Sequence, residues 1–243
     1  MTEQYDCPVW FNGKDIIEAA FCDEFMDEHQ LTYDSSAFFT PEGRMTDERL
    51  LKQKIYHCLK FCAVKNVPHT IGNILELLKF YNTGVDLTPQ QDRVHLANGT
   101  LFLDGRFTEE KGYCSHRLAV AYQPDAPKPE RWLHFLSELL EPEDIPTLQE
   151  YLGYCLIPST KGQRMMVIKG SGGEGKSQIG SVMTAVFGSN MKDGSIGKFS
   201  ENRFARADLE HQLLMVDDDM KMEALKQTNY VKSIVTAQGK MDL

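Results

Sequence analysis

The sequence predicts an α/β protein in which a mixed α+β module precedes a helical segment and a three-layer core. Apolar residues recur at helical spacing in several stretches, and short apolar runs that end in glycine-rich or acidic residues indicate buried strands. With 243 residues, 42% of them hydrophobic, the chain is long enough for one large or two modest domains. We expect the N-terminal module over residues 1–129, the helical segment over 130–160 and the core over 161–243.

The first module opens with helical periodicity. Apolar spacing predicts helices over residues 16–25, 50–62 and 70–78, of which the second is expected to be capped by Thr46. Residues 31–40 favour extended chain between the first two helices. The stripes of these helices are expected to face a core.

A small β-meander is predicted next. Apolar residues alternate over 94–107 around the turn dipeptides Asn98-Gly99 and Asp104-Gly105. Prolines over 124–129 then mark a linker. Apolar spacing over 132–152 predicts two helices before the core.

Composition restricts the class of protein. The net charge of −9 argues against a broad basic surface that coats nucleic acid, although residues 161–206 carry eight Lys and Arg against three Asp and Glu. No apolar run approaches the ~20 residues of a membrane span, and no secretory signal opens the chain. We therefore expect a cytoplasmic protein with no membrane partner. The six cysteines form no C-x-x-C pair, which argues against a disulfide framework or a zinc ribbon.

The clearest motif lies at residues 170–177. It reads Gly170-Ser171-Gly172-Gly173-Glu174-Gly175-Lys176-Ser177, which fits the pattern G-x-x-x-x-G-K-S of a phosphate-binding P-loop. Glycines let successive backbone N–H groups point at one anion, and the following helix adds its positive end. We expect this segment to bind nucleotide, with Lys176 on the β- and γ-phosphates and Ser177 on Mg²⁺. The apolar run 165–168 predicts a strand before the loop, and Gly188 marks the end of the helix after it.

A second motif lies some forty residues downstream, where Leu213-Leu214-Met215-Val216 runs into three consecutive aspartates. This pattern predicts a buried strand whose carboxyl end carries acids to the magnesium ion. We expect Asp217 to hold the metal and Asp218 to polarise the attacking water. Lys176, Asp217 and Asp218 are therefore the candidate catalytic residues.

Several further motifs occur in a fixed order around these two. They are Asn98-Gly99, Trp132 with Phe135-Leu136, Leu148-Gln149-Glu150-Tyr151-Leu152-Gly153-Tyr154, Phe199, Phe204-Ala205 with Ala207 and Leu209, and Lys232-Ser233-Ile234-Val235-Thr236. In their order and spacing the chain resembles the phage and plasmid DNA primase-helicases related to the poxvirus primase-helicase. The resemblance covers roughly residues 90–243.

This resemblance implies a superfamily 3 helicase, an AAA+ type ATPase that uses ATP and Mg²⁺. Such proteins assemble as rings, usually of six subunits, and pull single-stranded DNA through the centre. The resemblance places Lys240, and also Lys232, where a basic residue of the pore would contact the DNA backbone. Lysine contacts to phosphates need no base readout, which suits a motor that moves over any sequence. A phage or mobile element replicating in a bacterial host is the expected source.

The chain departs from the family pattern at its end. Residue 243 precedes the strand and the arginine that the resemblance implies for sensing and completing the active site. Without them, we expect the ATPase core to be incomplete, the strand Leu213–Val216 to keep an unpaired edge, and turnover to be weak.

Two alternatives stay open. The chain can be a nucleotide-binding but catalytically silent fragment or interaction module. It can also be a P-loop phosphotransferase for a small metabolite, which needs a lid with several arginines; Arg203 and Arg206 are the arginines in the expected interval.

Overall fold

The computed structural model describes residues 8–34, 36–62, 64–81, 84–201, 209, 211–220, 231–232 and 235–236. The chain divides into two compact units, Met1–Thr88 with Gly112–Ser115, and Pro89–Lys111 with His116–Leu243. Both contain helices and small sheets, so the protein is of mixed α and β structure, as expected. The boundaries expected at residues 129 and 160 stay predictions.

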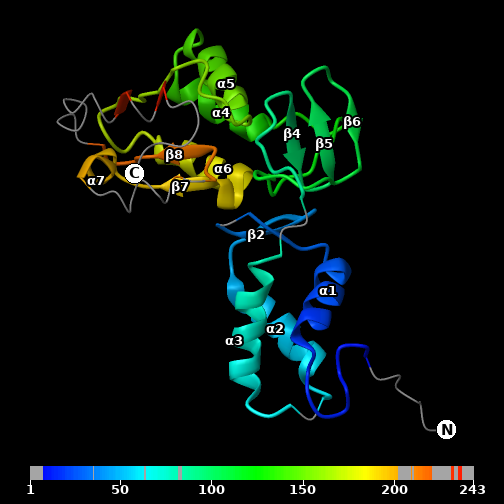
Figure 1. Cartoon of the computed structure of the whole chain (residues 1–243). Coiled ribbons are helices and arrows are strands. Elements are labelled where there is room, and N and C mark those ends of the chain that lie inside the picture. Colours follow the sequence, from blue (N-terminus) through cyan, green and yellow to red (C-terminus); the bar gives the residue numbers. More distant parts are fainter. Residues whose placement is uncertain are drawn as a thin grey trace. The chain divides into compact units, whose positions relative to one another are not determined.

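Three helices form most of the first unit (Figure 1). They are α1 (Glu18–Glu28), α2 (Glu48–Leu59) and α3 (Val67–Leu78). Helix α3 packs against both α1 and α2. Their buried faces include Phe21 and Phe25 of α1, Leu51 and Ile55 of α2, and Ile74 and Leu78 of α3. The helical spacing in the sequence therefore identified the core faces of this unit.

The helix starts differ from those expected. Asp47, not Thr46, caps α2, because its carboxylate accepts a hydrogen bond of 2.8 Å from the Arg49 N–H. Helix α3 begins at Val67 behind Asn66, so Thr70 lies inside it. Neighbouring polar residues are equally suitable caps in a sequence, and the approach of the chain selects between them.

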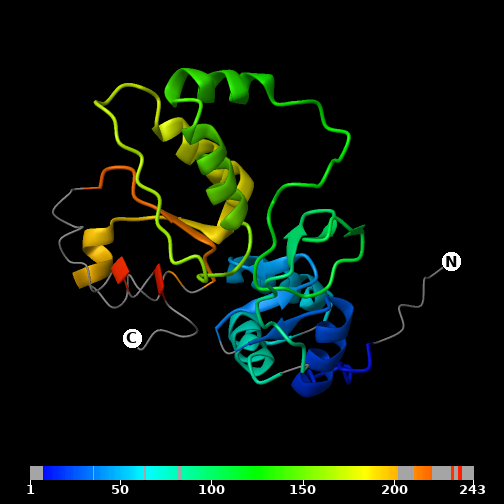
Figure 2. The ribbon, with the colours of Figure 1, turned by 90° about the horizontal axis from the view of Figure 1, so that it is seen from above.

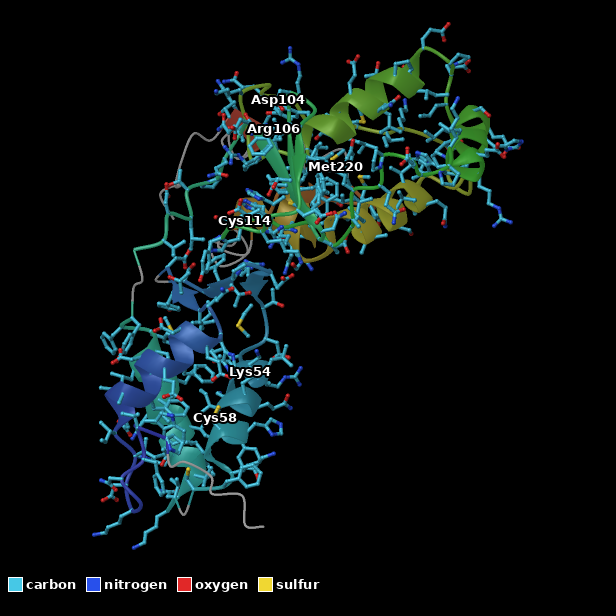
Figure 3. The ribbon with its side chains drawn as sticks, turned by 90° about the vertical axis from the view of Figure 1, so that its right-hand side faces the viewer. Lys54, Cys58, Asp104, Arg106, Cys114 and Met220 are labelled. Carbon is cyan, nitrogen blue, oxygen red and sulfur yellow. The ribbon has the colours of Figure 1, made fainter. Side chains whose placement is uncertain are left out.

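A three-stranded antiparallel sheet completes the first unit. Its strands are β1 (Thr32–Tyr33), β2 (Phe38–Thr40) and β3 (Gly43–Met45). Lys54 and Cys58, labelled in Figure 3, come from α2. Cys58 is partly buried and packs against the core, and burial raises the pKa of its thiol.

The predicted meander is present in the second unit. It consists of β4 (Arg93–Leu96), β5 (Gly99–Phe102) and β6 (Phe107–Thr108), all antiparallel. A side chain at Gly99 would collide with the carbonyl oxygen of Thr108 and the ring of Phe107, which explains the glycine. Asp104 and Arg106 lie at the turn between β5 and β6 (Figure 3), where the Asp104 carboxylate accepts from the Arg106 N–H at 3.0 Å.

Residues 109–129 contain no helix or strand and trace a long loop (Figure 2). Two helices follow, α4 (Glu130–Leu139) and α5 (Asp144–Tyr154). After the glycine-rich loop come α6 (Ser177–Phe187), the short 3-10 helix η1 (Gly188–Asn190), β7 (Met191–Asp193), α7 (Ile196–Glu201) and β8 (Leu214–Val216). Residues from the meander, α4, α5 and α6 share one core, which includes Val94, Leu136, Leu148, Ile179, Met183 and Phe187.

Strands β7 and β8 lie side by side and parallel, with Met191 opposite Leu214 and Asp193 opposite Val216 (Figure 1). The predicted strand at Leu213–Val216 is thus present as β8, although it is half-buried rather than buried as expected. The strand predicted at Met165–Ile168 is not present, because within the described ranges no segment pairs with it. Its side chains are partly exposed, Val167 by 49%. An apolar run supplies the propensity for a strand, but a hydrogen-bonded neighbour has to complete it.

None of the helices in the described part of the chain is long and apolar enough to cross a membrane.

Candidate functional site

The glycine-rich loop, residues 170–177, leads directly into α6. Gly172, Gly173 and Gly175 have φ angles of +95°, +76° and +93°. This left-handed region is rarely adopted by residues that carry a Cβ. A Cβ on Gly172 or Gly173 would meet open space, so the backbone conformation, rather than crowding, requires glycine there.

Helix α6 holds the loop at its N-terminus. Lys176 immediately precedes the helix, and the Gln178 N–H donates to the Gly175 carbonyl at 2.9 Å. Ile179 and Met183 bury the inner face of α6 and fix it to the core. Because the first N–H groups of a helix lack intrahelical acceptors, this end carries a partial positive charge beside the loop. The arrangement favours an anion.

The Glu174 side chain folds back onto the loop itself. Its Oε1 accepts a hydrogen bond of 2.9 Å from the Ser171 N–H, and its Oε2 accepts one of 2.8 Å from Lys176 Nζ. These two donors hold the pKa of the Glu174 carboxyl below its usual range, the lysine contributing most. Glu174 is therefore charged at neutral pH and is paired with the lysine expected to bind phosphate.

Ser177 and Asp218 meet although forty-one residues separate them. The Ser177 hydroxyl donates to the Asp218 carboxylate, at 2.9 Å from Oδ1 and 3.0 Å from Oδ2. Asp218 follows β8, while Ser177 opens α6. The fold thus brings the two sequence motifs together at one point.

The Asp217 carboxylate faces the start of α7 rather than Ser177. Its Oδ2 accepts a hydrogen bond of 2.8 Å from the N–H of Ile196, the first residue of α7. This contact satisfies one of the N–H groups that a helix leaves open at its start. Asp218, and not Asp217, is the acid that faces the loop residue expected to bind the metal.

The structure describes one of the two lysines expected to contact DNA. Lys232 is exposed in a short helical stretch, where its carbonyl accepts from the Thr236 hydroxyl at 2.7 Å. Lys240 lies outside the described residues. No described contact joins Lys232 to the glycine-rich loop.

The donor chemistry at Ser177 and Asp218 suits a hard cation. No cluster of three or more His, Cys, Asp or Glu side chains forms a metal site by itself within the described ranges. Magnesium does not need one, since it keeps several waters and is commonly held by one or two protein oxygens together with substrate phosphates. A hydroxyl and a carboxylate within 3 Å of each other meet that requirement.

Glu174 is the site residue whose role the sequence did not reveal. In the motif it occupies one of the four unspecified positions. Its acidic side chain two residues before Lys176 was the available signal, because oppositely charged side chains that are near each other in the sequence can form an ion pair.

Comparison with known proteins adds one match. The model of a family of unknown function, DUF5906, matches residues 168–243, a range that contains both the glycine-rich loop and the three aspartates. No curated protein matches the chain.

Proposed function

We propose that the second unit binds a magnesium–nucleoside triphosphate, ATP, at the glycine-rich loop. The observation that carries this proposal is the meeting of Ser177 with Asp218, since it joins the end of a parallel strand to the residue that opens the helix after the loop. That relationship is the one a phosphate-binding loop needs for its metal.

Each group then has a task. The backbone N–H groups of residues 170–177 and the start of α6 attract the phosphates, and Lys176 adds a full positive charge. Ser177 and Asp218 would hold the metal ion from the protein side. Asp217 supports the site by fixing the start of α7. The bound cation supplies charge neutralisation at the phosphates.

We further propose that nucleotide binding serves a DNA motor of the superfamily 3 helicase type. The resemblance in the order of the motifs over residues 90–243 supports this, and Lys232 and Lys240 are the proposed DNA contacts. Assembly into a ring, which the resemblance implies to be a hexamer, is part of the same proposal. The local excess of basic residues over 161–206 is compatible with phosphate contacts.

Coupling between the two ligands tests the motor proposal independently of turnover. Affinity for a fluorescein-labelled oligo(dT) is measured with and without a non-hydrolysable ATP analogue and Mg²⁺. Two sites of one motor influence each other, so we expect the analogue to change the DNA affinity, typically by about 5- to 150-fold. The variant Lys176→Ala removes this change, and Lys128→Ala, an exposed lysine of the same unit outside the basic stretch 161–206, retains it.

The other outcomes identify the alternatives. If the analogue binds but leaves the DNA affinity unchanged, the motor proposal fails and the silent nucleotide-binding module is favoured. Phosphate transfer from ATP to a small acceptor, without any effect of DNA, would favour the phosphotransferase.

A further inference from the structure

The carboxylate of Glu174 lies where a phosphate would have to enter the loop. It bonds to Ser171 at the start of the loop and to Lys176 at its end. Both donors belong to the set that a phosphate-binding loop offers to its ligand. One internal anion thus holds the two ends of the loop.

Gly170 shows how closely this carboxylate approaches the backbone. The nearest atoms to a Cβ placed on Gly170 are Glu174 Oε2 and Lys176 Nζ. Any side chain at position 170 would push these groups apart. Glycine therefore leaves the space that the carboxylate fills.

A carboxylate and a phosphate compete for these donors. The Ser171 N–H carries a single proton, so it cannot serve both anions with good geometry. Two anions in contact around one ammonium group also repel each other. The Glu174 side chain can move into solvent, since it is 41% exposed, against 23% for the Lys176 side chain.

We propose that the Glu174 carboxylate competes with the nucleotide: it occupies the place of a phosphate in the glycine-rich loop, and its side chain has to move away before a triphosphate binds. This inference rests on the proposed nucleotide site and adds a regulatory element to it. Glu174 thereby lowers the affinity for nucleotide and excludes weaker anions, because only a ligand with several phosphate contacts offsets the lost bonds.

Three variants test the competition by titration with Mg·ATP. Glu174→Gln removes the charge and the ion pair to Lys176. Glu174→Asp keeps the charge but is one methylene too short to reach both Ser171 and Lys176. Glu150→Gln is the matched control, since it makes the same change at an exposed position on α5.

We expect Glu174→Gln and Glu174→Asp both to bind Mg·ATP more tightly than the wild type, by roughly 2- to 5-fold, the range for releasing a partly exposed charged pair. Glu150→Gln binds as the wild type does. Equal affinities for Glu174→Gln and wild type would overturn the competition. So would a Glu174→Asp variant that binds like the wild type, because general charge repulsion would then explain the gain.

Failure of the nucleotide site itself gives a different pattern. In that case neither the wild type nor any Glu174 variant shows saturable uptake of Mg·ATP, and both proposals fall. Tighter binding confined to the Glu174 variants supports both.

Discussion

The side-chain amide of Asn190 donates a hydrogen bond of 2.7 Å to the backbone carbonyl of Arg117, 73 residues away in the sequence. The same amide donates to the Phe187 carbonyl at 2.9 Å, and the Asn190 backbone carbonyl accepts from the Leu213 N–H at 2.8 Å. Asn190 thus ties the end of α6 to the residue that leads into β8. The Asn190 side chain holds the end of α6 to Arg117, and its backbone carbonyl holds the residue before β8.

Replacement of Asn190 is expected to destabilise the second unit. Asn190→Ala removes the side-chain donor to the carbonyls of Arg117 and Phe187, which costs about 1–3 kcal/mol. Urea unfolding measures this in a Trp10→Phe background, where Trp132 is the remaining tryptophan and reports on the second unit. Gln178→Ala, an exposed change on α6, is the control and should unfold with the wild-type midpoint. A midpoint for Asn190→Ala equal to that of the control would show that Asn190 is dispensable.

His95 makes the stability of the second unit depend on pH. Burial, and then the charges of Arg117 and Arg93, lower the pKa of His95 from 6.5 to about 4. The unfolded chain therefore binds a proton at a higher pH than the folded chain does. The contribution of neutral His95 to the free energy of unfolding is therefore fully present above pH 6.5 and is lost as the pH falls toward 4. The loss is on the order of 2 kcal/mol after allowance for partial exposure.

Unfolding of the Trp10→Phe protein at pH 7 and pH 5 measures this effect. The variant His95→Gln cannot take up the proton and should lose much less stability between the two values. A pH dependence that is the same with and without His95 would assign the effect to other groups.

The two aspartates are expected to behave differently toward magnesium. Asp218→Asn weakens Mg·ATP binding by roughly 10- to 100-fold, because a hydrogen bond to a charged group contributes about 1.5–3 kcal/mol. It has little effect on ATP binding in EDTA. Asp217→Asn lowers stability through the start of α7 and changes magnesium dependence less. Calorimetric titrations with and without Mg²⁺ distinguish the two variants. A larger effect on magnesium dependence from Asp217→Asn than from Asp218→Asn would assign the metal contact to Asp217.

Lys232 offers a test of the DNA contact. If it binds a phosphate, Lys232→Ala reduces the slope of log affinity for oligo(dT) against log salt by about one, and leaves ATP binding unchanged. Lys128→Ala, the control outside the basic stretch, keeps the wild-type slope. An unchanged slope for Lys232→Ala removes this residue from the DNA interface.

Strong local signals in the sequence predicted much of the fold. The helix after the loop has apolar residues at Ile179 and Met183 and stops at Gly188, and these features depend only on neighbouring residues. The meander was equally accessible, since Asp104-Gly105 lies in the turn between β5 and β6. The first turn is one residue earlier than expected, because Gly99 already belongs to β5 and pairs with Leu96. The segment Met165–Ile168 was predicted as a strand for its apolar content, but pairing depends on distant chain.

The candidate site was predictable in its members but not in its pairings. Adjacent residues at the end of a strand point to opposite sides, so the sequence alone does not tell whether Asp217 or Asp218 reaches Ser177. The register of β8 against β7 decides it, with Val216 opposite Asp193. The return of Glu174 to Lys176 likewise depends on the path of the loop, which the φ angles of Gly172, Gly173 and Gly175 determine.

Calorimetric titration of the wild type and Lys176→Ala with Mg·ATP tests the central claim most directly. We expect saturable binding of one nucleotide per chain by the wild type and by Lys128→Ala. Lys176→Ala should bind roughly 10- to 100-fold more weakly, in keeping with the loss of a charged hydrogen bond to phosphate. Absence of saturable binding by the wild type, or binding that does not change on loss of Lys176, would contradict the account.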